Sequence, residues 1–179
     1  MPTEPLPVVS SLPDEADPET RTAGDDGPPS VSRDRTVVRF VKTPHHLNGR
    51  GTRLRPAAFR PPAGSDEISV VQQDFDGDDY CKKMAVAKVP VSQYHGLASG
   101  LVGAIMDSGA RAVLDTPHIF PGHADIITPY PSPKDEPPPA EETKALQEFC
   151  EALVEHFHYF ADPNKAAEGW EGPPLARAS

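Results

Sequence analysis

Proline and charge divide this chain into a leading segment that cannot form a core and a body that can. The chain has 179 residues and 23 prolines, and seven of those prolines lie in residues 1–32. The same segment carries seven acidic side chains against one basic side chain, Arg21. A segment with this composition and no apolar period cannot bury enough surface to offset its conformational entropy. We therefore expect residues 1–34 to form a disordered acidic tail.

The sign of the charge reverses directly after this segment. Residues 33–60 carry eight basic side chains and one acid, Asp34, although the whole chain has a formal net charge of −10. Clustered guanidinium groups bind phosphates and other anions. The candidate anion-binding residues are Arg39, Arg50, Arg53, Arg55 and Arg60. The net negative charge disfavours nucleic acid as the partner unless the basic face is kept apart from the acidic one.

Interleaved strand and helix patterns predict an α+β or small α/β domain over residues 35–163. Runs rich in β-branched residues predict strands at 36–41, 68–73, 111–114 and 124–128. An apolar stripe from Leu146 to Phe160, with glutamates on the other face, predicts a terminal helix that Asp162 and Pro163 end. We expect a single compact domain with a short mixed sheet and two main helices, followed by a C-terminal extension over residues 164–179.

The second main helix is predicted over residues 92–106. Ser92 is a suitable N-cap, apolar residues recur at three- and four-residue steps from Tyr94 to Met106, and Gly109 can end the helix. Glycines within the segment weaken a helix by up to about 1 kcal/mol each relative to alanine. The apolar spacing nevertheless favours a helix.

Tyr94-His95-Gly96, followed by Ile105 and Gly109, is similar to the opening motif of poly-ADP-ribosyl and RNA phosphate-transferase folds. The resemblance implies a strand-borne His-Gly pair that holds the ribose of a nicotinamide nucleotide. It covers residues 94–109 only, and the further Tyr and Glu strands of those families need a longer downstream stretch than this chain has. Because the spacing predicts a helix here, the expected function is not based on this motif.

The densest group of polar side chains lies between Asp115 and Asp125. If a strand begins at His123, its alternation places His123 and Asp125 on one face. An imidazole beside a carboxylate can form an acid–base pair or supply two ligands to a divalent metal, and His118 can supply a third. His118, His123 and Asp125 are therefore the candidate catalytic residues, and a divalent metal is the cofactor that they would accept. The alternative is that these groups only form hydrogen bonds with nearby backbone.

Cysteine content and hydropathy limit the class of protein. Cys81 and Cys150 are too few for a disulfide scaffold or a four-thiolate zinc site. No window of about 18 apolar residues lacks charge, so we expect no transmembrane helix and no membrane partner. The first residues do not form a basic leader followed by an apolar stretch, so we expect no secretory signal peptide and a cytoplasmic location.

The sequence leaves three hypotheses for function. The favoured one is a small non-catalytic protein-interaction module of the accessory, inhibitor or immunity type, with another protein as its partner. The first alternative is a metal-assisted hydrolase or transferase that uses His118, His123 and Asp125. The second alternative is an anion or nucleic-acid binder that uses the basic segment from Arg39 to Arg60.

Overall fold

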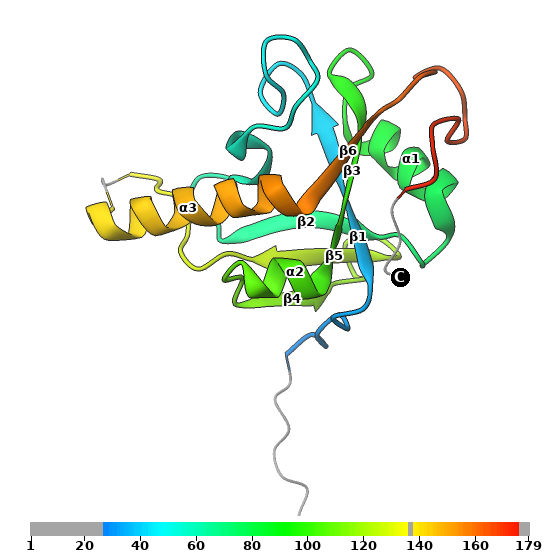
Figure 1. Cartoon of the computed structure of the whole chain (residues 1–179). Coiled ribbons are helices and arrows are strands. Elements are labelled where there is room, and N and C mark those ends of the chain that lie inside the picture. Colours follow the sequence, from blue (N-terminus) through cyan, green and yellow to red (C-terminus); the bar gives the residue numbers. More distant parts are fainter. Residues whose placement is uncertain (1–26, 136–137, 176–179) are drawn as a thin grey trace, which may run out of the picture.

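The computed structural model describes residues 27–135 and 138–175 and confirms an α+β fold. Its centre is one six-stranded sheet in the order β4-β5-β2-β1-β3-β6 (Figure 1). The strands are β1 (Thr36–Lys42), β2 (Glu67–Gln72), β3 (Tyr94–Leu101), β4 (Ala112–Asp115), β5 (His123–Ile127) and β6 (Phe157–Ala161). All neighbouring strands in the sheet run antiparallel, where a mixed sheet was expected.

Helices cover both faces of this sheet (Figure 1). The helices are α1 (Gly77–Lys88), α2 (Val102–Asp107), α3 (Ala140–His156) and the short 3-10 helix η1 (Pro56–Phe59). Side chains alternate between the two faces along each strand. Val37 and Val41 of β1 thus lie in the core under α2, α3 and η1, whereas Val38 lies in the core under α1.

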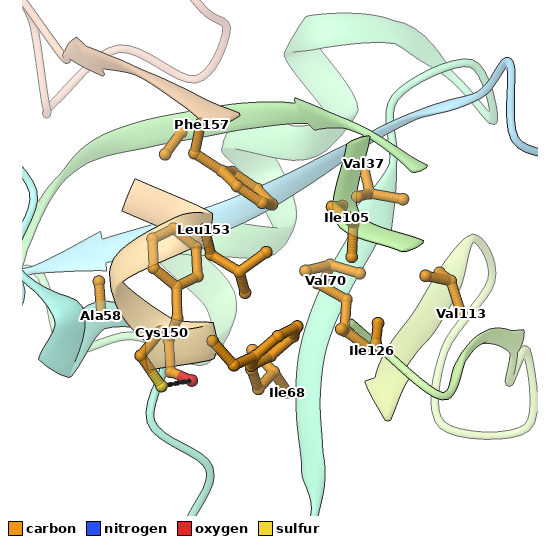
Figure 2. Close-up of a cluster of buried hydrophobic side chains, with 14 of the residues drawn as sticks. Val37, Ala58, Ile68, Val70, Ile105, Val113, Ile126, Cys150, Leu153 and Phe157 are labelled. Atoms are coloured by element: carbon orange, nitrogen blue, oxygen red, sulfur yellow. Dashed lines mark hydrogen bonds between the residues drawn. The ribbon is translucent and has the colours of Figure 1, made fainter. Parts of the chain in front are cut away.

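The larger core lies between α3 and the sheet, as Figure 2 shows. Leu153 of α3 packs in the same cluster as Ile68 and Val70 of β2. The Cys150 thiol donates a hydrogen bond to the backbone oxygen of Phe59 at 3.3 Å, which ties η1 to α3. The Phe59 ring also contacts the Phe157 ring, with 4.6 Å between their centroids. These contacts fix the start of β6 against η1.

The smaller core lies under α1 and is closed by the C-terminal residues. Leu175 is buried there, and its N–H donates to Asp78 Oδ2 at 3.1 Å. The N–H of Trp170 donates to Asp79 Oδ1 at 2.7 Å. Residues 163–175 therefore fold back over the beginning of α1.

β1 and β2 pair only at Val37 and Val38 and then diverge. The side chain of Arg39 fills the gap between them, with Nη1 donating to Ser69 O at 2.7 Å and Nε donating to Ala58 O at 3.1 Å. Burial lowers the pKa of Arg39 to about 10, partly offset by the Asp125 carboxylate. Both hydrogen bonds link backbone segments, so Arg39 stabilises the fold at this position.

The predicted helix over residues 92–106 is wrong, because Tyr94–Leu101 is strand β3 and only Val102–Asp107 is helical. β3 is an inner strand with packed groups on both faces, so its apolar residues do not follow a period of two. Gly100 lies against the Phe157 ring, where a Cβ would come within 2.8 Å of a ring carbon. His95 and Gly96 thus lie on a strand, as they do in the families whose motif they resemble.

The predicted terminal helix is correct as far as His156 and wrong beyond it. The N–H of Phe157 donates to Leu153 O as the last helical bond, and Phe157–Ala161 then pairs with β3. Aromatic residues favour strands, and four of the five residues of β6 are Phe, His, Tyr and Phe. Asp162 and Pro163 thus follow a strand instead of ending a helix.

The other predicted strands are confirmed to within two residues at each end. Most of the predicted tail, residues 1–26, lies outside the described residues. Where disorder was predicted up to residue 34, residues 29–31 pair with β4 and Val31 is buried in the larger core. In the described part of the chain, no helix has both the length and the apolar character needed to span a bilayer.

Candidate functional site

The predicted catalytic residues His123 and Asp125 lie together on one face of β5 and share a buried threonine. The Thr116 hydroxyl donates to Asp125 Oδ2 at 2.8 Å and lies 2.7 Å from His123 Nδ1. A hydroxyl has one proton, so the contact with His123 requires that Nδ1 carry its own proton and donate it. His123 is 2% exposed and Asp125 is 6% exposed. The polar groups of this cluster therefore bond mainly to one another, away from solvent.

Electrostatics in this cluster favour the neutral imidazole. Burial lowers the pKa of His123, while the Asp125 carboxylate opposes that shift. The Phe120 ring covers the imidazole edge-on, with 4.6 Å between the ring centroids. His118 is exposed in the loop between β4 and β5 and does not join the hydrogen-bonded group. Across residues 27–135 and 138–175, no three His, Cys, Asp or Glu side chains are arranged to hold a metal ion.

The predicted anion-binding arginines separate into two sets. Arg39 is bonded to the backbone of β2 and η1 inside the fold. The other four arginines are exposed or line open cavities, and within the described residues none of their side chains makes an ion pair or a hydrogen bond: Arg50, Arg53, Arg55 and Arg60. Local acids therefore do not neutralise this part of the basic segment.

The sheet has two outer strands, and the outer edge of β4 is covered. Residues 29–31 run beside it: Val31 N–H donates to Val113 O at 2.8 Å, and Asp115 N–H donates to Pro29 O at 2.8 Å. Ser30 also forms a bridge with Leu114, and Val31 is buried in the larger core. Residues 29–31, which belong to the predicted tail, thus form hydrogen bonds with the outward backbone groups of β4.

The outer edge of β6 is open. Asp162 N–H donates to His95 O at 3.0 Å, and bonded and non-bonded pairs alternate along an antiparallel ladder. Phe160 and His158 therefore direct their backbone groups toward β3, whereas Tyr159 and Ala161 direct theirs away. No strand other than β3 pairs with β6 in the described part of the chain. The N–H and C=O of Tyr159 and Ala161 are thus available to another chain.

A cavity of about 380 Å³ lies beside this open edge. Thr52, Arg53 and Leu54 form one side of the cavity, and β6 and the end of α3 form the other. We call it the β6 groove, and its lining residues on the second side are Val154, Glu155, Phe157, His158 and Tyr159. The groove has an extended backbone on one side and an arginine on the other.

A β-bulge turns His95 toward this groove. Val41 pairs with Gly96 while Lys42 pairs with Tyr94, so His95 is the extra residue, and bulges redirect side chains in this way. His95 Nδ1 shares a hydrogen bond with the Tyr159 hydroxyl. On its other side the imidazole faces Gly51, where a Cβ would lie 3.7 Å from Nε2. His95 therefore links β6 to the loop that forms the far side of the groove.

The protonation states of His95 and Tyr159 follow from their surroundings. Burial raises the pKa of Tyr159 to about 12, so its hydroxyl keeps its proton at neutral pH. Burial and, to a lesser extent, the charge of Lys165 lower the pKa of His95. A neutral imidazole that accepts from Tyr159 at Nδ1 carries its proton on Nε2. The His95–Tyr159 pair is thus uncharged, and the Nε2–H of His95 faces the loop that contains Gly51.

A buried ion pair fixes the end of β6. Lys82 Nζ of α1 lies 2.6 Å from Asp162 Oδ2, and both side chains are 0% exposed. Lys82 Nζ also donates to Asn164 O at 2.8 Å. Burial and the neighbouring Asp162 carboxylate raise the pKa of Tyr94, so the Tyr94 hydroxyl stays protonated beside this ion pair. The residue after β6 is therefore held to α1 by charge.

Sequence reasoning did not identify Tyr159, Ala161 or the ion pair of Lys82. The aromatic run from Phe157 to Phe160 was a usable signal for a strand, because such runs are uncommon on one turn of a helix. The comparisons give no independent assignment: no protein-family model, curated protein or solved structure matches the chain. No family match therefore supports the resemblance of residues 94–109 to transferase motifs.

Proposed function

We propose that this chain is a small protein-interaction module that binds an extended segment of a partner protein as an added strand on β6. The observation that supports the proposal is the open edge itself, where Tyr159 and Ala161 direct unpaired backbone groups outward beside the β6 groove. Strand addition to an exposed sheet edge is a common mode of peptide recognition. The function is therefore binding rather than catalysis.

The difference between the covered edge of β4 and the open edge of β6 supports this proposal. An exposed strand edge promotes aggregation, and proteins usually shorten, cover or interrupt it. This chain covers β4 with residues 29–31 and leaves β6 with no proline and no charged residue along its length. Apolar atoms of Leu54, Val154 and Phe157 also line the groove and can pack against the aliphatic parts of the side chains that an added strand directs toward it.

The cluster of Thr116, His123 and Asp125 gives less support to the hydrolase or transferase alternative. Its polar atoms are buried and hydrogen-bonded within the cluster, and His118 does not join it. A substrate would first have to displace these bonds to reach Asp125. Strand addition at β6 requires no such displacement.

Selection from a displayed library of random peptides tests the proposal, because it requires no identified partner. Ala161→Pro removes an outward N–H at a position where an edge strand tolerates proline, whereas Ala161→Val keeps that N–H. Peptides selected on the unaltered chain are expected to lose at least about tenfold in affinity for Ala161→Pro and little for Ala161→Val. Selected peptides that bind Ala161→Pro equally well, or a library that yields no binder, would overturn the proposal.

A further inference from the structure

We infer that the segment bound at the β6 groove is an acidic peptide of another protein, whose carboxylates pair with Arg50 and Arg53. This inference rests on the proposed function and adds the chemistry of the partner. Because alternate side chains of a strand point to the same face, it further implies carboxylates at every second residue of the bound segment.

The unpaired state of these two arginines is the first reason. Five other basic side chains of the described chain have acidic partners, in the pairs Arg33–Asp107, Arg35–Asp74, Lys82–Asp162, Arg111–Asp66 and Lys144–Glu148. The chain has a net charge of −10 and so has acids to spare, yet none described lies within ion-pair distance of Arg50 or Arg53. A guanidinium can bind a carboxylate through two parallel hydrogen bonds.

The position of the two arginines is the second reason. Arg53 lines both the β6 groove and an adjoining cavity of about 530 Å³, which Arg50 also lines. The loop that carries them is closed by a bridge between Leu47 and Leu54. Asn48 Oδ1 accepts from the N–H of Thr52 at 2.9 Å, which holds the loop from inside. Both arginines therefore belong to one constrained loop, with Arg53 across the groove from β6 and Arg50 in the cavity that adjoins it.

The other charges at the groove do not cancel this preference. Glu155 and His158 line the groove as well, and the charge of Lys165 acts on His95 at its end. Arg50, Arg53 and Lys165 thus outnumber Glu155, while the His95–Tyr159 pair is neutral. An acidic strand gains from this balance, and a basic strand is repelled by it.

Charge and backbone chemistry also argue against other occupants. A second copy of this chain pairing through β6 would offer Phe157–Ala161, a segment that has no carboxylate for Arg50 or Arg53. The acidic segment of residues 1–32 has seven prolines, which lack the N–H donors that a strand needs. Single-stranded RNA would satisfy the arginines but would not use the outward N–H and C=O of Tyr159 and Ala161.

Fluorescence anisotropy with two short labelled peptides tests the inference on the full chain. One peptide alternates Val with Glu and the other alternates Val with Lys. The Glu peptide is expected to bind at least about tenfold more tightly than the Lys peptide, and the double variant Arg50→Gln/Arg53→Gln is expected to lose at least about tenfold for it. The matched control, Arg55→Gln/Arg60→Gln, removes the same charge outside the groove and should leave the affinity within about twofold.

The outcomes separate this inference from the proposed function. Equal binding of both peptides, lost in Ala161→Pro, would overturn the acidic preference and leave strand addition standing. Binding of neither peptide, or binding that Ala161→Pro does not change, would overturn both. A stable dimer that the Glu peptide dissociates would show that a second copy occupies β6. An RNA oligonucleotide that competes with the Glu peptide and binds Ala161→Pro unchanged would show a general polyanion site instead.

Discussion

Each outer strand of the sheet has an edge of backbone N–H and C=O groups that no neighbouring strand of the sheet pairs, and the two edges differ in how these groups are covered. The edge of β4 is covered by residues 29–31, which take up its backbone hydrogen bonds and bury Val31. The edge of β6 is open, yet the strand itself is held firmly, by the aromatic contact at Phe157 and by the ion pair at Asp162. An edge that is rigid but unpaired is ready to accept a strand without first reordering, which lowers the entropic cost of binding.

The largest expected effect comes from breaking the anchor at the end of β6. Lys82→Met leaves the Asp162 carboxylate buried without its counter-charge, which should lower the free energy of unfolding by about 3–5 kcal/mol. Urea unfolding measures this loss. The double variant Lys82→Met/Asp162→Asn removes both charges and should recover a large part of it. If the double variant loses as much free energy of unfolding as Lys82→Met and Asp162→Asn lose separately when added together, the two residues are not coupled.

Uncovering β4 should have the next largest effect. Removal of residues 1–31 exposes the β4 edge and withdraws Val31 from the core, at a cost of about 2–3 kcal/mol in unfolding free energy. The newly exposed edge should also make the chain self-associate with rising concentration, which sedimentation measures. Removal of residues 1–26 alone is the control and should leave both properties unchanged. Equal behaviour of the two truncated chains would contradict the role given to residues 29–31.

A smaller effect is expected in the polar cluster beside β4. Thr116→Val removes the hydroxyl that both His123 and Asp125 contact and should cost about 1–2 kcal/mol in thermal or urea unfolding. Thr143→Val is the control, because the hydroxyl of Thr143 makes one long, exposed hydrogen bond of 3.4 Å. Thr116→Val without loss of stability would indicate that the cluster is not structural and would favour the catalytic alternative for His123 and Asp125.

The smallest effect is the pH dependence that His46 contributes to stability. Burial and the nearby charges of Arg39 and Lys42 lower the pKa of His46 to about 3, so the folded loop holds a neutral imidazole. The unfolded chain binds a proton near pH 6.5, so stability from His46 is full above that pH and is lost as the pH falls toward 3. Between pH 7 and pH 5.5 the loss should be on the order of 1 kcal/mol. Urea unfolding of the unaltered chain and of His46→Gln at the two pH values measures this part, because the difference between the two chains leaves out the contributions of His95 and His123, whose pKa values are also lowered.

The sequence predicted those elements whose pattern is local. β1 and β2 have β-branched runs, and the stripe of Leu146, Cys150 and Leu153 marks one face of α3. β3 escaped prediction because both of its faces are buried, by α1 on one side and α3 on the other, which removes the alternation of an ordinary strand. The apolar positions that remain then resemble a helical repeat.

The β6 groove depends on features that no local pattern encodes. Its two sides, residues 52–54 and 157–159, are about a hundred positions apart, and a single-residue bulge at His95 connects them. Sequence reasoning also could not separate Arg39 from Arg53. Both belong to one basic segment, but the divergence of β1 from β2 buries the first, whereas the second stays beside a cavity.

Amide hydrogen exchange along β6, with and without the Glu peptide, tests the open edge most directly. In the free protein, the amides of Tyr159 and Ala161 should exchange rapidly and those of His158 and Phe160 slowly, because only the latter pair point toward β3. Addition of the peptide should protect Tyr159 and Ala161 as well. Slow exchange at those two amides in the free protein, or no added protection on binding, would contradict strand addition at β6.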